Sequence, residues 1–97
     1  MTISIKQFEN LHNCIFDIYF QPSAKFSSEL IEVKSLNSHS SDLEQIKSFS
    51  LVFQSNHIER FEQNIYKVLH PELDEMFLFL VPIEENKIGI KYEAIFN

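Results

Sequence analysis

A histidine and a cysteine lie two residues apart near the start of this sequence, as His12 and Cys14. In an extended segment such residues share a face, so the imidazole could take the thiol proton and activate the sulfur as a nucleophile. Cys14 also stands in phase with Phe16 and Ile18, the apolar positions of the same segment. That phase favours a buried structural thiol, so an enzyme that uses Cys14 is the weakest of three functional hypotheses.

Imidazole also binds zinc, and the chain has four histidines: His12, His39, His57 and His70. No two of them are spaced two or four residues apart, the spacings that place two ligands on one face of an element. With a single cysteine, neither a thiolate metal cluster nor an intrachain disulfide can form. We therefore expect no metal site, and we expect His70, which precedes Pro71, to cap a turn or to pair with a carboxylate.

Paired carboxylates can hydrolyse glycosides, and four candidates lie in or beside predicted strands: Asp17, Glu32, Glu62 and Glu93. Most of them stand opposite the predicted core positions, which is typical of a solvated strand face. Glu93 differs because it lies between Tyr92 and Ala94 in an otherwise apolar segment. A buried carboxylate needs a partner, which Lys67 or Lys91 could supply.

Other functional classes are excluded by composition. The single glycine, Gly89, is predicted in a hairpin, so no glycine-rich phosphate loop exists, and no serine has a nucleophile-elbow context. A net charge of -6, with eight scattered Lys and Arg residues, argues against nucleic acids and anionic membranes. No secretory signal is visible, and no apolar run approaches the ~20 residues that span a bilayer. We expect no catalytic residue, no cofactor, no membrane insertion and a cytoplasmic location.

The elements that must position these residues are mostly strands. A short amphipathic helix is predicted over residues 4–11, with Ser4 as its cap and Ile5, Phe8 and Leu11 on one face. Six strands are predicted at residues 14–20, 27–36, 46–54, 63–70, 76–83 and 88–96. Residues 37–42 read as a polar loop, and residues 55–61 as either a loop or one helical turn. This order predicts a single mainly β domain over residues 1–97, an antiparallel meander forming a small barrel or sandwich.

The strand over residues 76–83 is unusual because it is apolar on both faces. A half-solvated antiparallel strand should alternate apolar and polar residues, so both faces of this strand must be covered. The core covers one face, and either the N-terminal helix or another chain covers the other. The helix is favoured because intramolecular cover is the commoner arrangement. If another chain covers it, the contact surface is formed by Phe77, Phe79 and Val81.

Several motifs of the second half of the chain carry a resemblance: Gln63-Asn64-Ile65-Tyr66, His70-Pro71, Phe79-Leu80-Val81-Pro82 and Tyr92-Glu93-Ala94-Ile95-Phe96-Asn97. Together with Phe8 and Phe16, they resemble a family of small bacterial proteins classed as a domain of unknown function, over nearly the whole chain. The resemblance implies no catalytic residues. Its members are similar to proteins encoded beside phage-tail-collar-like fibre proteins, which implies a role in assembly. The segment after His70-Pro71 departs from the pattern because it lacks a glycine, which leaves the turn type open.

The prediction for function is a non-enzymatic interaction or assembly module. Its partner is a protein, such as a fibre or tail-collar-like protein, or a second copy of the chain. The partner would bind along a strand edge or on the apolar surface around Phe77 and Phe79. The alternative is a barrel that carries an apolar ligand among Phe49, Phe53, Tyr66, Phe79 and Tyr92. Such a carrier needs a cavity of ~300 Å³, whereas a barrel this small is usually filled by its own side chains. The last strand is expected inside the sheet, paired with residues 76–83, with Phe96 largely buried.

Overall fold

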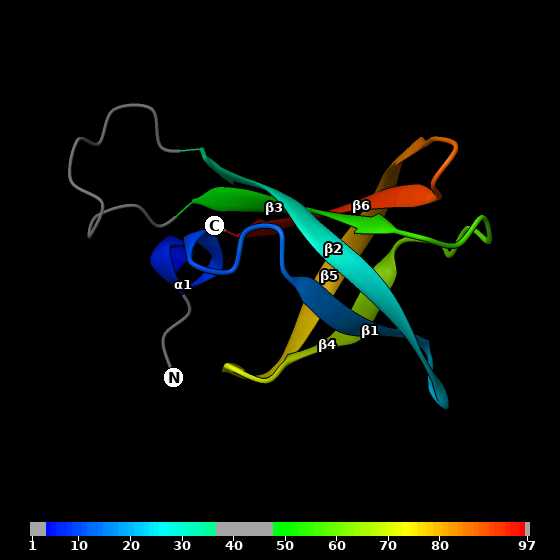
Figure 1. Cartoon of the computed structure of the whole chain (residues 1–97), viewed down its shortest axis with the longest axis horizontal. Helices are drawn as coiled ribbons and strands as arrows, with labels where there is room; N and C mark the ends of the chain where they lie inside the picture. Colours follow the sequence, from blue (N-terminus) through cyan, green and yellow to red (C-terminus); the bar gives the residue numbers. More distant parts are fainter. Residues whose placement is uncertain (1–3, 37–47, 97) are drawn as a thin grey trace.

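Six antiparallel strands close into a barrel, and one short helix lies across an end of it (Figure 1). The structure is a computed structural model that describes residues 4–36 and 48–96. Its elements are α1 (Ile5–Glu9), β1 (Ile15–Gln21), β2 (Ala24–Ser35), β3 (Phe49–Ser55), β4 (Asn64–His70), β5 (Leu73–Glu85) and β6 (Ile90–Phe96). The mainly β prediction, with about six antiparallel strands and one short N-terminal helix, is confirmed. The loop predicted over residues 37–42 lies outside the described residues.

The order of strands around the barrel is β1-β2-β3-β6-β5-β4, and β4 closes the ring by pairing with β1. The predicted meander is therefore wrong, because β3 has β6 as its neighbour instead of β4. Residues 56–63 contain neither helix nor strand and take the chain from β3 to β4. Every described strand of the ring has a neighbour on both sides, although residues 73–80 of β5 have no partner residues on β6.

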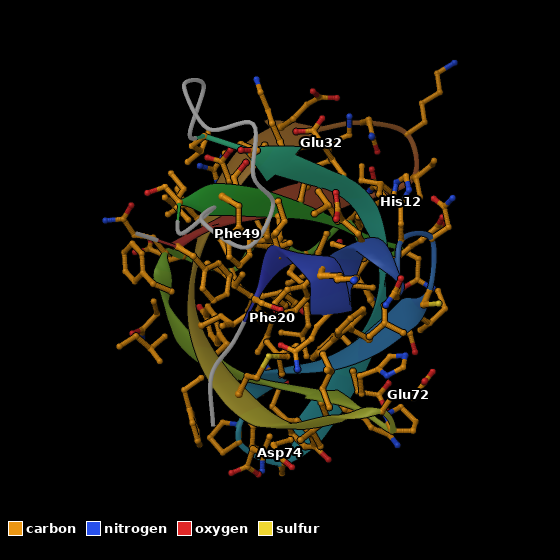
Figure 2. All side chains as sticks on the ribbon, turned by 90° about the vertical axis from the view of Figure 1, so that its left-hand side faces the viewer. His12, Phe20, Glu32, Phe49, Glu72 and Asp74 are labelled. Atoms are coloured by element: carbon orange, nitrogen blue, oxygen red, sulfur yellow. The ribbon has the colours of Figure 1, made fainter. Side chains whose placement is uncertain are left out.

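The helix α1 seals one end of the barrel, and Figure 2 shows it lying across the ring of strands. At its start, the Ser4 backbone N–H donates a 3.0 Å hydrogen bond to the side chain of Gln7. Phe8, fully buried, places its ring 5.7–6.5 Å from those of Phe16, Phe49 and Phe96. These contacts fix the helix on the end of the core, so its predicted apolar face is confirmed.

A second aromatic group fills the opposite half of the barrel. The Phe20 ring stacks on Phe61 at 4.8 Å and contacts Tyr92 at 4.6 Å and Tyr66 at 4.9 Å. The two groups are linked through the interior by Phe16 and Phe53, two rings that meet edge to face, and by other fully buried side chains. Aromatic rings therefore occupy the barrel from one end to the other.

Strand β6 lies inside the sheet, between β3 and β5, as expected. It pairs with β3 from Phe96 to Lys91, but its pairing with β5 begins only at Val81 and runs toward Glu85. Phe96, which is expected to be largely buried, is partly buried and packs against the core. Phe96 stacks on Phe49 at 4.5 Å beside α1, at the mouth of the barrel.

The turn between β5 and β6 depends on one asparagine and one glycine. Asn86 Oδ1 accepts hydrogen bonds from the backbone N–H groups of Ile88 and Gly89, at 3.0 and 2.9 Å. The Asn86 amide also exchanges hydrogen bonds with the Gln54 amide on β3. Gly89 packs so closely on the chain after β3 that a Cβ atom would lie 2.4 Å from the Ser55 carbonyl oxygen. A side chain is excluded there by contact, since the φ angle of Gly89 is not positive.

Replacing Gly89 with alanine should therefore destabilise the fold. The added methyl group would meet backbone atoms of Ser55 and His57 that cannot rotate away, and overpacking of this kind costs ~1 to 3 kcal/mol. Urea unfolding of Gly89→Ala would measure the loss, with Lys87→Ala, at an exposed position of the same turn, as the control. Equal stability of the two variants would contradict the close approach.

Candidate functional site

The outer face of β4 and β5 carries a group of exposed apolar side chains, which we call the β4–β5 surface. The exposed fractions are 60% for Ile65, 63% for Phe77, 52% for Phe79 and 56% for Ile95 on the neighbouring β6. Val81 belongs to the same face and is half-buried. Ile65 lies directly opposite Phe79 in the β4–β5 ladder, and Lys67 lies opposite Phe77. The surface is therefore continuous across paired strands.

Strand alternation explains which residues form this surface. Met76, Leu78 and Leu80 are buried in the core, so the intervening Phe77 and Phe79 point outward. The prediction that the N-terminal helix covers this face is wrong, because α1 lies on the barrel end and contacts β2. The ligand carrier hypothesis is also wrong in placing Phe79 inside the barrel, although Phe49, Phe53 and Tyr92 are fully enclosed.

A shallow hollow of about 480 Å³ adjoins this surface between β1, β4 and β5. Its lining includes Tyr19, Ile65, Lys67 and Phe77. The Lys67 ammonium lies 4.4 Å from the centre of the Tyr19 ring and 3.9 Å from a carboxylate oxygen of Glu75. The arrangement suits contact with apolar side chains, since its walls are aromatic and aliphatic and its one cation is already engaged.

Glu93 lies on the outer face of β6 within this apolar region. Its direct cross-strand neighbours are Val52 on β3 and Val81 on β5, and its side chain is half-buried. The predicted lysine partners are wrong: Lys67 pairs with Glu75, and Lys91 pairs with Glu84 at 3.3 Å. Within residues 4–36 and 48–96, no basic side chain lies within ion-pair distance of the Glu93 carboxylate.

The sequence candidates His12, Cys14 and His70 contact backbone groups or the core. His12 Nε2 makes a 2.8 Å hydrogen bond with the backbone carbonyl of Ile31, and Cys14 is partly buried against the core. His70 Nδ1 accepts a 3.0 Å hydrogen bond from the Glu72 backbone N–H, which confirms its prediction as a turn cap. Across the described ranges, no group of three or more His, Cys, Asp or Glu residues is placed to hold a metal ion. His39 lies outside these ranges.

Two tyrosine hydroxyls, which sequence analysis did not single out, tie the irregular segment before β4 to the barrel. Tyr92 Oη accepts a 2.9 Å hydrogen bond from the Phe61 backbone N–H, and Tyr66 Oη donates to the Glu62 carbonyl. Burial raises the pKa of Tyr92 above 10.0, and it also raises the pKa of Tyr66, with a further increase from the Glu62 carboxylate. Their role is structural, since each hydroxyl is bonded to backbone.

Alkaline pH should destabilise the protein partly through Tyr92. A raised native pKa means that, as the pH passes the ordinary tyrosine pKa of 10.0, the unfolded chain releases a proton that the native protein keeps. The free energy of unfolding should therefore fall above about pH 10. Tyr92→Phe should lose ~1 kcal/mol at neutral pH, with the hydrogen bond, and should fall less steeply above pH 10. Urea unfolding of both proteins across this range would show it, and parallel pH profiles would contradict it.

The exposed rings of the β4–β5 surface should add little to stability. Threonine keeps the β-propensity at an exposed strand position, so Phe77→Thr and Phe79→Thr should each change the free energy of unfolding by no more than ~1 kcal/mol. Leu78→Ala, at the buried position between them, should cost ~2 to 5 kcal/mol. Thermal and urea unfolding of the three variants would compare them. A large loss in either threonine variant would show that the rings support the fold itself.

The fold and the surface together define a small closed β-barrel with an apolar outer face. Residues 3–96 match a family described as a domain of unknown function (DUF6916), and the chain belongs to this family. The match confirms that a family of unknown function covers nearly the whole chain, as the motifs indicated. No curated protein and no solved structure matches the chain. In the part of the chain that the structure describes, no helix is long and apolar enough to cross a membrane.

Proposed function

We propose that this protein is a non-enzymatic interaction or assembly module that binds a partner protein on its β4–β5 surface. One observation carries the proposal. All ten phenylalanines of the chain lie in the described residues, and only Phe77 and Phe79 are exposed; the others are buried or packed against the core. Exposure of two neighbouring aromatic rings to water is unfavourable, and a partner that covers them would remove this cost.

Closure of the barrel determines how such a partner would bind. Strand addition needs a free edge, and each described strand already has two neighbours over part of its length. The exposed rings favour side-chain contact on a face, and burial of apolar area there supplies roughly 25 cal/mol per Å² before the costs of association. Phe77, Phe79 and Ile65 offer adjacent side chains for such contact.

The resemblance described above adds a partner class to the proposal. It implies a bacterial protein whose relatives are similar to proteins encoded beside phage-tail-collar-like fibre proteins, so we propose a fibre or tail-collar-like protein as the partner, bound in the cytoplasm. A second copy of the chain is the other occupant to be tested. In either case the barrel would act as an accessory to assembly.

Co-expression with the proteins encoded by the flanking genes tests the proposal. The wild-type chain should copurify with one defined neighbour, and Phe77→Thr/Phe79→Thr should lose it while keeping its fold. Ile88→Thr, an exposed apolar position in the β5–β6 turn, is the matched control and should retain the partner. Equal capture by all three proteins would contradict a role for this surface. Concentration-dependent dimers that the double variant abolishes would instead identify a second copy as the occupant.

The alternative function, a carrier of an apolar ligand, is favoured by one observation. Ser28 is almost fully buried on β2, opposite Phe16, and its hydroxyl makes no hydrogen bond. A buried hydroxyl without a partner is costly, and a polar atom of a ligand would satisfy it. The tightly packed rings around Phe16 and Phe53 argue for the interaction module instead. A small molecule that stays bound in native mass spectrometry would favour the carrier.

A further inference from the structure

We propose that the β4–β5 surface binds a basic, apolar segment of its partner, in which a lysine or arginine stands beside aliphatic or aromatic side chains. The apolar residues would cover Phe77 and Phe79, and the cation would pair with Glu93. This inference rests on the proposed function and extends it, because it specifies the chemistry of the partner.

The position of Glu93 is the main argument. It stands between Val52 and Val81 in the cross-strand ladder, and Ile95 follows it two residues later on the same face. Its carboxylate is half-buried in this apolar setting without a cation of the described chain beside it. A partner that covers the surface would remove the remaining water from Glu93, and an ionised carboxylate that loses water needs a counter-charge.

Neither of the two lysines near this surface pairs with Glu93. Lys67 is paired with Glu75, and Lys91 is paired with Glu84, so both lysines already have a carboxylate partner. Arg60 and Glu62, which carry opposite charges, both line the hollow of about 270 Å³ beside Val81, and no ion pair joins Arg60 to Glu93 within the described residues. The whole chain carries a net charge of -6, which adds long-range attraction for a basic partner.

The same charges argue against a second copy as the occupant. Two chains of charge -6 repel each other, and in a two-fold dimer through this surface each copy would present the same Glu93 carboxylate. An acidic segment would be repelled for the same reason. A neutral apolar segment would bury Glu93 without compensation. Specificity for a basic segment therefore arises in two ways: Glu93 attracts its cation, and Glu93 makes binding of an acidic segment, a neutral segment or a second copy less favourable.

Selection from a phage-displayed library of random peptides provides a test that needs no known partner. Wild-type protein and Phe77→Thr/Phe79→Thr would be screened in parallel, and only sequences lost by the double variant count as ligands of this surface. These sequences should combine Lys or Arg with Leu, Ile, Phe or Trp. A synthetic peptide of the leading sequence would then be titrated against Glu93→Gln, with Glu72→Gln, an exposed carboxylate in the β4–β5 turn, as the charge-matched control.

Glu93→Gln should weaken the peptide by about three- to tenfold and flatten the salt dependence of its binding, whereas Glu72→Gln should not. This inference would be overturned if the peptides that depend on Phe77 and Phe79 lacked basic residues, or if Glu93→Gln and Glu72→Gln had equal effects. Either result would still be compatible with the proposed interaction module. Absence of any peptide that depends on Phe77 and Phe79 would contradict the interaction module itself. Wild-type dimers held together by these rings would replace the basic segment with a second copy.

Discussion

The structure depends on closing a narrow six-stranded ring around aromatic side chains. The ring closes through a short ladder in which residues Asp17, Ile18 and Tyr19 of β1 face Leu69, Val68 and Lys67 of β4. Inside it, Phe16 and Phe53 meet edge to face, and Phe20 contacts Tyr92. Because a barrel of this size is just wide enough for side chains, each inward ring also determines which neighbouring residue points outward. Closure of the ring therefore determines which side chains form the core and which form the outer surface.

Much of this architecture follows from local patterns. The phase of Phe16 and Ile18 in β1 is predicted correctly, and the Ser4 cap with Phe8 predicts the helix. The order of strands could not be predicted in the same way, because the β1–β4 and β3–β6 pairings join segments far apart in the chain. The prediction that the helix covers the outer face of β5 failed for a similar reason. The sequence pattern does not show that Phe8 contacts three rings at the end of the barrel.

The candidate surface was predictable only in part. The lack of alternation in β5 marks Phe77 and Phe79 as unusual, but Ile65 joins them only through the register of the β4–β5 ladder. Glu93 stands out in sequence as a carboxylate among apolar residues. The sequence does not show that the Glu93 carboxylate lacks an ion-pair partner, because this depends on Lys67 and Lys91 pairing with Glu75 and Glu84 on β5. Likewise, no pattern indicates that the Tyr92 hydroxyl meets the Phe61 backbone.

The closed barrel separates the residues that stabilise it from those that can bind. Along β5, buried residues such as Leu78 alternate with outward ones such as Phe77, so a change on the outer face leaves the core packing intact. The ladders also hold the outward side chains at regular spacings, about 7 Å between alternate residues of one strand. A partner would therefore meet a rigid arrangement of two rings, with Glu93 on the adjoining β6, and would lose little free energy to ordering it. Since every described strand of the ring has two neighbours, recognition on this outer face would depend mainly on the identity and charge of those side chains.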